Sequence, residues 1–580
     1  MRKQRIFAII LAIFMVVCSF GMLACGKKKS NSRYQAVYNL PSNKKITIKV
    51  KNYGMGPGTL WLDEAADRFA EKYQDVKYGN KTGVYVKIEE DSEQNTNAMA
   101  NDSTNIFFDE KTSDPNALAQ SNLLLNLDSI VKDTTREGGT LESKIFSSTK
   151  NIVMKGDSYY ALPHYEFYPG VVFNRDTFDK LNAYFAHEDE VNTIDHSSKY
   201  GDACFIGDET AQKSVGPDGE PDTDDDGLPC SLEEFIILCD YIKKESNSTI
   251  YPITVTGKYF SYYPDYLMMG LWASLAGAEQ MRNYYNCTGA IEVVERDSSG
   301  NYKFTSEPLF EGIDYVKKPV TKVVQRKEDG SEGWMGSDMA AKYYAIAMFE
   351  ILYKEGFLSP SATKSNDHWE TQMDLYLDGK FNTNNSAMLI EGSYWYNESN
   401  EKGGFDYYES YVGKKRDQIN VSWMGLPTKV YTEDTEAKDP CLLDCACAYA
   451  MINGNVAKND ALKQACLDFL AFLYTEQELG YFTAKTGIAR PINYTLTSDN
   501  LSVMSNYAKQ LWKMRDSAQG SNIVSWSGTT EMFLQKKGTL KLHLDCGVFG
   551  SGKDKVSTFI KNNKSASEIL QLCSTYAKWN

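Results

Sequence analysis

The chain has 580 residues, a hydrophobic fraction of 42% and a formal net charge of −15 at pH 7. This length is too great for one hydrophobic core, so two or more lobes are expected, and the apolar content excludes a disordered protein. An acidic surface repels phosphate backbones, which excludes an extended nucleic-acid interface.

Residues 1–26 combine a positively charged head, an apolar run and an exit of small residues. The run over 7–24 carries no charge, and Cys25 follows it directly. This order is typical of a secretory signal, and the cysteine at its exit resembles the acylated cysteine of bacterial lipoproteins. The resemblance implies cleavage before Cys25 and a lipid anchor there. An uncleaved membrane anchor is the alternative, because the run is nearly long enough to span a bilayer.

The segment that follows the polar tether alternates strands and helices. ITIKV (46–50) alternates as a strand, the glycine-rich loop 52–59 comes next, and an apolar stripe predicts a helix over about 60–73. VYVKI (84–88) and NIFFD (105–109) predict two further strands. This alternation indicates an α/β fold with a largely parallel sheet.

Later segments are more helical and carry many aromatic residues. The stretch 156–181 is too rich in aromatic residues for a plain connector, and 387–399 and 419–427 are typical of strands that lead into loops. CLLDCACAYAMI (441–452) predicts one buried strand, and an amphipathic helix is expected over 462–475.

DTDDDGLPCSLE (222–233) fits the calcium-loop pattern D-x-[DN]-x-[DN]-G-x5-E at every defined position. Its carboxylates repel one another unless a cation neutralises them, and the alternative is a solvated acidic turn. Ser231 and Glu234 predict a capping box that begins the next helix. We expect a structural Ca²⁺ that ties a long insertion to the second lobe. The expected ligands are Asp222, Asp224, Asp226, the carbonyl of Leu228, and Glu233.

The order of four phrases resembles the extracellular solute-binding proteins (family 1 type) of carbohydrate ABC transporters. These phrases are YYALP (159–163), VVFNRDTF (171–178), LDGKFNTNNSAMLIEGSYW (377–395) and the helix-and-turn segment 469–492. The resemblance implies a periplasmic-binding-protein type II fold, with two α/β lobes joined by hinge crossovers that close on a ligand. It also implies delivery of that ligand to permease subunits in the membrane.

The resemblance divides the chain into a signal, a tether and two lobes. The expected boundaries are a lipoprotein signal peptide at 1–25, a polar tether at 26–43, lobe 1 at 44–168 plus 428–490, lobe 2 at 169–427 plus 491–580, and a calcium-loop insertion at about 204–230.

Candidate ligand-binding residues lie in loops after strand ends, where open α/β sheets bind their ligands. The chain has 38 Tyr and 9 Trp, and such rings stack on the apolar faces of sugars. The glycine loop 52–59 could also present backbone N–H groups to a polar ligand, and Asp109 could accept hydrogen bonds from sugar hydroxyls. The candidates are Trp395, Tyr394, Tyr165, Glu166, His164, Asp109, Tyr53, Trp61, Trp423 and Arg490.

We therefore expect a monomeric lipoprotein that binds a sugar or oligosaccharide and has no catalysis of its own. It would lie on the outer face of the cytoplasmic membrane, or in the periplasm if the host has an outer membrane. The alternatives are a surface-anchored carbohydrate-active enzyme (a glycosidase or lyase) with structural calcium, and an adhesion or scaffold lipoprotein. The sequence shows neither HExxH nor GxSxG, although paired carboxylates for glycoside hydrolysis can be distant in sequence.

Overall fold

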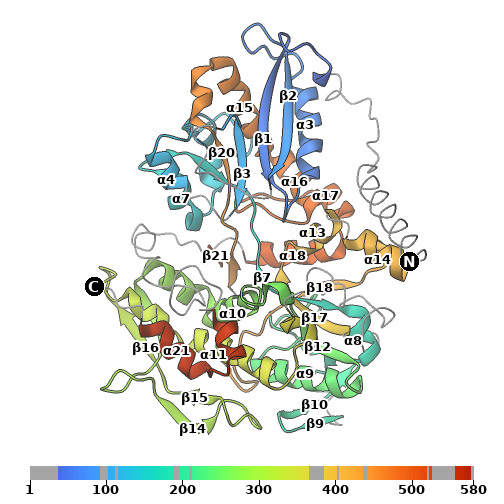
Figure 1. Ribbon diagram of the computed structural model, residues 1–580, viewed down its shortest axis with the longest axis vertical. Helices are drawn as coiled ribbons and strands as arrows, with labels where there is room; N and C mark the ends of the chain where they lie inside the picture. The colour runs from blue at the N-terminus through green and yellow to red at the C-terminus, as the bar shows by residue number, and fades with distance from the viewer. Residues whose placement is uncertain are drawn as a thin grey trace, which may run out of the picture.

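A computed structural model of the chain shows two lobes, one above the other (Figure 1). The predicted signal peptide and lipidation site Cys25 lie outside the described residues. The structure describes residues 37–91, 99, 102–110, 115–187, 195–207, 212–364, 385–401, 404–413, 415–435, 441–518, 522–525 and 555–575.

The upper lobe is built on a five-stranded sheet. In spatial order the strands are β2 (Gly83–Asp91), β1 (Lys45–Tyr53), β3 (Ile106–Glu110), β20 (Ala448–Ile452) and β6 (Ala161–Pro163). β1 runs parallel to β2 and β3, whereas β20 is antiparallel to β3 and β6. The strands β2, β1 and β3 therefore form the expected parallel sheet. β20, which comes from the second half of the chain, is antiparallel to its neighbours, so the complete sheet is mixed.

Helices cover this sheet because their apolar residues recur at helical spacing. α3 (Leu60–Lys72) buries Trp61, Leu62, Ala65, Ala66 and Phe69 against the sheet, at the three- and four-residue intervals of one helix face. α15 (Asp460–Leu473) packs against β1, and α16 (Glu476–Thr486) packs against α3. The helices expected near 60–73 and 462–475 are confirmed.

The lower lobe holds a second, four-stranded sheet. Its order is β12 (Ile250–Thr254), β17 (Asn385–Gly392), β7 (Pro169–Asn174) and β18 (Val421–Met424). β7 is antiparallel to both of its neighbours, and every residue of β7 is buried. The long helix α10 (Pro264–Asn286) packs on β7 and β17, and it kinks at Gly277, whose φ of 75° suits glycine.

Other helices and hairpins complete the lower lobe. α9 (Leu232–Glu245) packs against β12, and α11 (Ala340–Lys354) packs against α10. The lobe also holds antiparallel strand pairs, some of which lie at the bottom of Figure 1. Their strands are β9 (His196–Ser198), β10 (Gly201–Ala203), β13 (Gly289–Val294), β14 (Phe304–Pro308), β15 (Lys317–Pro319) and β16 (Thr321–Arg326).

Two chain segments cross between the lobes side by side. Residues 164–168 lead from β6 to β7, and residues 445–447 lead from β19 (Leu442–Asp444) to β20. The N–H of Cys445 donates to the carbonyl of Phe167 (2.9 Å), and the N–H of Phe167 donates to Asp444 (3.3 Å). The single strand expected over 441–452 is therefore wrong, because the chain changes lobes in its middle. The exact lobe boundaries stay predictions.

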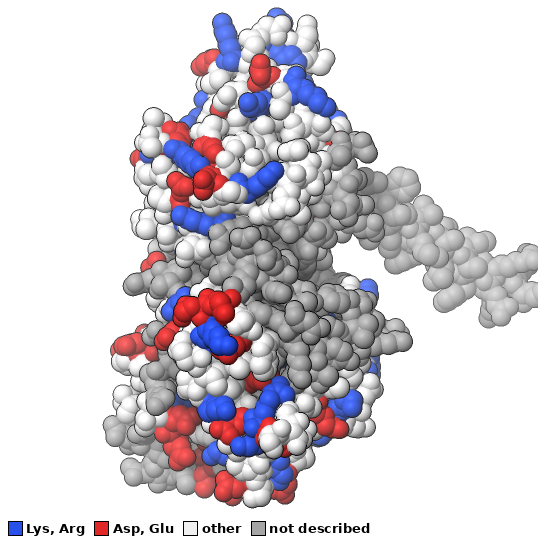
Figure 2. Space-filling view, turned by 90° about the vertical axis from the view of Figure 1, so that its left-hand side faces the viewer, with Lys and Arg blue, Asp and Glu red and all other residues white. Residues whose placement is uncertain are grey.

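Charges of both signs are mixed over the described part of the face shown in Figure 2, on the upper and the lower lobe alike. The described part of that face therefore shows no basic stripe for a phosphate backbone. Within the described part of the chain, no helix is both long enough and apolar enough to span a membrane.

Candidate ligand-binding site between the lobes

The lobes touch where the glycine loop after β1 meets α13 (Trp395–Glu401), which follows β17. Asn397 of α13 donates from Nδ2 to the carbonyl of Gly56 at 2.8 Å. Gly56 has a φ of 60°, and a Cβ there would lie 3.0 Å from the hydroxyl of Tyr165. The loop can therefore approach both α13 and Tyr165 only with a glycine at this position.

A cluster of tyrosines lies beside this contact and is drawn from both lobes. Tyr165 donates a short hydrogen bond to Glu110 at the end of β3, and the hydroxyls of Tyr266 and Tyr394 lie 3.3 Å apart. The ring of Phe167 contacts Tyr394 edge-on, with a centroid distance of 4.9 Å. Phenol hydroxyls, a carboxylate and ring faces are the groups that bind sugar hydroxyls and sugar faces.

The electrostatics of the cluster follow from its burial. Burial, and then the neighbouring Glu110 carboxylate, raises the pKa of Tyr165 well above its usual value. Burial also raises the pKa of Tyr394, together with Tyr263 and Tyr266. These phenols therefore remain protonated at neutral pH and can donate hydrogen bonds.

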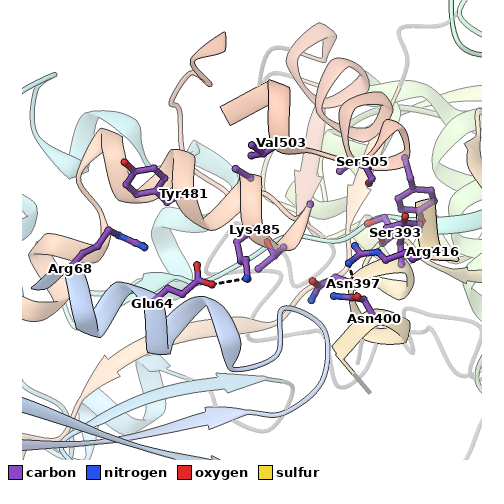
Figure 3. Close-up of a pocket in the computed structure, with 16 residues that line it drawn as sticks. Glu64, Arg68, Ser393, Asn397, Asn400, Arg416, Tyr481, Lys485, Val503 and Ser505 are labelled. Atoms are coloured by element: carbon purple, nitrogen blue, oxygen red, sulfur yellow. Dashed lines mark hydrogen bonds and ion pairs between the residues drawn. The ribbon is translucent and has the colours of Figure 1, made fainter. Parts of the chain in front are cut away.

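A cavity of about 330 Å³ opens between the lobes next to this cluster (Figure 3). α3 and α16 of the upper lobe form one wall, and Figure 3 shows Glu64, Arg68, Tyr481 and Lys485 on it. The opposite wall comes from α13, the 3₁₀ helix η6 (Arg416–Gln418) and the start of α18 (Asn506–Ser517). This size is at the lower end of the usual range for small-ligand sites. The polar lining residues of the second wall include Ser393, Asn397, Asn400, Arg416 and Ser505.

Three of the predicted ligand residues come together at the tyrosine cluster. Tyr165 and Tyr394 are buried in it, and the half-buried Tyr53 lies close enough to act on the pKa of Tyr165. Trp395 begins α13 and is 2% exposed, with its ring edge-on to Phe405. Trp395 therefore borders the interface through its helix, while its ring belongs to a hydrophobic core.

Trp61, His164 and Arg490 form a separate buried group inside the upper lobe. Arg490 donates from Nη1 to the carbonyl of His164 (3.0 Å), and its guanidinium lies 5.1 Å from the centre of the Trp61 ring. Burial, and then Arg490, lowers the pKa of His164 well below its usual value, so this imidazole is neutral. The three side chains hold the start of a crossover segment in place.

The remaining predicted residues lie in strands or at the hinge. Glu166 is buried in the crossover between β6 and β7 and forms an ion pair with Arg515 of α18. Trp423 is 3% exposed in β18, and its ring lies where a side chain on Gly170 would stand. Asp109 is buried within β3, opposite Tyr449 of β20. None of these three side chains lines the cavity.

The sequence analysis missed several residues of the interface. Tyr263 and Tyr266 lie around the start of α10, and the aromatic run YFSYYPDY (259–266) could have marked this segment. The sequence analysis chose Asp109 as the end of the strand, but the strand extends one residue further, so the carboxylate at its end is that of Glu110. Arg416 lies in a short polar segment whose sequence carries no pattern that indicates a site.

The predicted calcium loop lies on the lower lobe, and its residues have other partners. The backbone N–H of Asp222 donates to Asp226 (2.9 Å), Asp224 pairs with Lys513 (2.9 Å), and Glu233 accepts from the N–H of Thr432 (3.1 Å). Within the described residues, no group of three or more His, Cys, Asp or Glu side chains is arranged to hold a metal ion. Calcium binding therefore stays a prediction. The capping box is confirmed, because Ser231 accepts from the N–H of Glu234 and Glu234 accepts from that of Ser231.

Comparison with known proteins finds similarity in fold. No family model matches the chain, and no curated protein matches it in sequence. The solved structure of a cyclic α-maltosyl-1,6-maltose binding protein from Arthrobacter globiformis aligns with a TM-score of 0.51 and 12% identity, covering 92% of this chain and 98% of that one. A chitin oligosaccharide binding protein aligns with a TM-score of 0.50 and 13% identity over the same shares. The predicted two-lobed α/β fold of solute-binding proteins is thereby confirmed.

Proposed function

We propose that this chain is the substrate-binding protein of an ABC importer, which captures a sugar or oligosaccharide between its lobes and delivers it to a membrane permease. The fold that it shares with two oligosaccharide-binding proteins supports this function. The observation that carries the proposal is the site itself, where Asn397 of one lobe bonds to Gly56 of the other beside tyrosines drawn from both.

Lobe closure provides the mechanism. In the open form, a ligand contacts only one lobe. In the closed form, it contacts both walls of the cavity and therefore makes more interactions. The ligand therefore binds the closed form more tightly and shifts the population toward it. A permease that recognises the closed form would then select loaded receptors from empty ones.

We further propose that the chain is anchored at Cys25 through an acylated thiol, on the outer side of the cytoplasmic membrane. The charged head, the apolar run and the small residues before this cysteine support the proposal. Cys25→Ser should release the protein from the membrane fraction of its host and abolish incorporation of a labelled fatty acid. A variant that stays in the membrane fraction would instead favour the uncleaved anchor.

A thermal-shift screen of the chain from residue 27 onward tests the main proposal. Mono-, di- and oligosaccharides should include at least one that raises the unfolding midpoint, because a ligand that binds only the folded state stabilises it by mass action. The ligand should be recovered chemically unchanged after long incubation. Cleavage of the ligand would favour the enzyme alternative, and a complete absence of shifts with sugars would contradict the receptor function.

A further inference from the structure

We propose that the ligand carries a carboxylate, as in an oligosaccharide with a hexuronic acid unit, and that Arg416 binds this group. This inference rests on the proposed function and names the class of sugar that the interlobe cavity takes. Three of the described residues that line the cavity are cations, namely Arg68, Lys485 and Arg416, and their contacts differ.

Two of these cations are already paired with acids. Arg68 donates from Nε and Nη2 to the two oxygens of Glu478, both at 2.7 Å. Lys485 pairs with Glu64 at 2.6 Å, as the dashed line in Figure 3 shows. Both cations belong to the upper wall, and their charges are balanced within the protein.

Arg416, on the opposite wall, has no such partner among the residues that the structure describes. Its Nη1 donates to the amide oxygen of Asn400 at 2.5 Å, and within the described residues no carboxylate pairs with it. Its side chain is exposed and its guanidinium lies beside Asn397 and Asn400 in Figure 3. Among the described residues, therefore, no carboxylate balances this positive charge on the lining of the cavity.

Aromatic rings fix the orientation of this guanidinium. It lies 5.1 Å from the centre of the Tyr396 ring and 5.8 Å from that of Phe405. Tyr396 is itself stacked on Tyr507, with centroids 5.1 Å apart and ring planes inclined by 16°. Stacking holds the plane of an arginine while its N–H groups stay available at the edge, and this planar fork matches the two oxygens of a carboxylate.

The surroundings of Arg416 suit a sugar that bears this group. Asn397, Asn400 and Ser505 supply amide and hydroxyl groups to the same cavity, which can bind neutral hydroxyls. The chain as a whole carries a net charge of −15, so an acidic ligand is repelled at long range and needs a local cation to bind. Of the described cations that line the cavity, Arg416 is the one without a carboxylate partner, and it can supply this charge.

Matched pairs of oligosaccharides test the proposal by calorimetry on the chain from residue 27 onward. Each pair has one member that ends in a hexuronate and one that ends in the corresponding hexose. The acidic member of the pair that binds should bind about tenfold or more tightly than the neutral one, because hydrogen bonds to a charged group are the stronger ones. Its affinity should also fall as salt concentration rises.

A pair of variants assigns the effect to Arg416. Arg416→Gln should lower the affinity for the acidic member to that for the neutral member, so that the preference within the pair disappears. Lys180→Gln is the matched control, because Lys180 is an exposed cation of α8 (Arg175–Leu181) that does not line the cavity. It should leave both affinities unchanged.

The outcomes separate this inference from the function on which it rests. Equal or tighter binding of the neutral sugars, or an acidic preference that survives in Arg416→Gln, would overturn the inference while the receptor function stands. Binding of no member of any pair would overturn both. Binding of the neutral members by Arg416→Gln shows that this variant is folded.

Discussion

At the scale of single residues, Arg515 connects the segments that pass between the lobes. It pairs with Glu166 of the first crossover, and its Nη2 donates to the carbonyls of Arg490 (2.9 Å) and Ile492 (2.7 Å). The side chains of Glu166 and Arg515 are 1% and 6% exposed, so neither charge is solvated by water. The pair therefore fixes the hinge only as long as both charges are present.

Glu166→Gln should be strongly destabilising, because it leaves the buried Arg515 without its carboxylate. Breaking one partner of a buried ion pair costs about 3–5 kcal/mol in the free energy of unfolding. Urea unfolding monitored by tryptophan fluorescence measures this loss. A loss below about 1 kcal/mol, the range of exposed pairs, would show that water reaches the pair.

Asp444, which lies beside this pair, makes stability depend on pH in a definite direction. Burial, and then the charge of Glu166, raises the pKa of Asp444 well above its usual value. The folded state therefore holds a proton that the unfolded state releases near pH 4. The resulting stabilisation is complete below that pH and is lost as pH rises through the folded-state pKa, with a slope of up to about 1.4 kcal/mol per pH unit.

Asp444→Asn should flatten this dependence without loss of the fold. The amide oxygen can still accept from the N–H groups of Phe167 and Ala446, which now bond to Asp444, and it does not titrate. Urea unfolding from about pH 5 to about pH 8 compares the variant with the parent. The exposed control Asp75→Asn should keep the parental slope, and an unchanged slope in Asp444→Asn would contradict the assignment.

At the scale of elements, the loop 222–233 remains the sharpest prediction from the sequence. A weak extracellular calcium site has a Kd of about 0.1–1 mM, so about 10 mM Ca²⁺ should stabilise the fold by about 1.4–2.7 kcal/mol. Thermal unfolding with Ca²⁺ and with Mg²⁺ measures the effect, and Asp226→Asn should abolish it. Asp218→Asn, an acid just before the motif, is the control. If Ca²⁺ shifts the unfolding temperature equally in both variants, the loop is a solvated acidic turn and does not bind calcium specifically.

Elements with a local signal were predictable from the sequence, and those that depend on the path of the chain were not. α3 and α15 follow from apolar spacing, and the start of α9 follows from the Ser231–Glu234 capping box. The prediction of one strand over 441–452 was wrong because the start of this segment, β19, belongs to a two-stranded sheet, whereas its end, β20, belongs to the five-stranded sheet of the upper lobe. The spacing of apolar residues does not reveal such a change of sheet.

The site divides in the same way. Tyr53, Tyr165 and Tyr394 could be proposed from the sequence because each lies at or near the end of a strand in the upper or lower sheet. Trp61 and Arg490 have the residue types of a sugar site, yet they pack against each other inside one lobe. Arg416 was missed because the role that we propose for it depends on rings and amides that only the folded chain brings beside it.

At the scale of the whole molecule, the two lobes are in direct contact at the glycine loop after β1. The hydrogen bond from Asn397 to Gly56 joins a helix of one lobe to a loop of the other, and Asn397 is 4% exposed. A ligand that stabilises closure should therefore make the particle more compact. Small-angle X-ray scattering should show a smaller radius of gyration when a sugar from the thermal-shift screen is added, and an unchanged radius would contradict a hinged clamp.

Asn397→Ala should shift the balance between the open and closed forms toward the open one. The variant loses one hydrogen bond between the lobes, worth about 0.5–1.5 kcal/mol, and this loss should raise the Kd for the ligand about two- to tenfold. Calorimetry gives the Kd, and scattering of the ligand-free variant should show a larger radius of gyration. Asn420→Ala, at an exposed position before β18, should change neither quantity. If Asn397→Ala binds as tightly as the parent, closure does not depend on this contact, and the remaining interface must hold the lobes together.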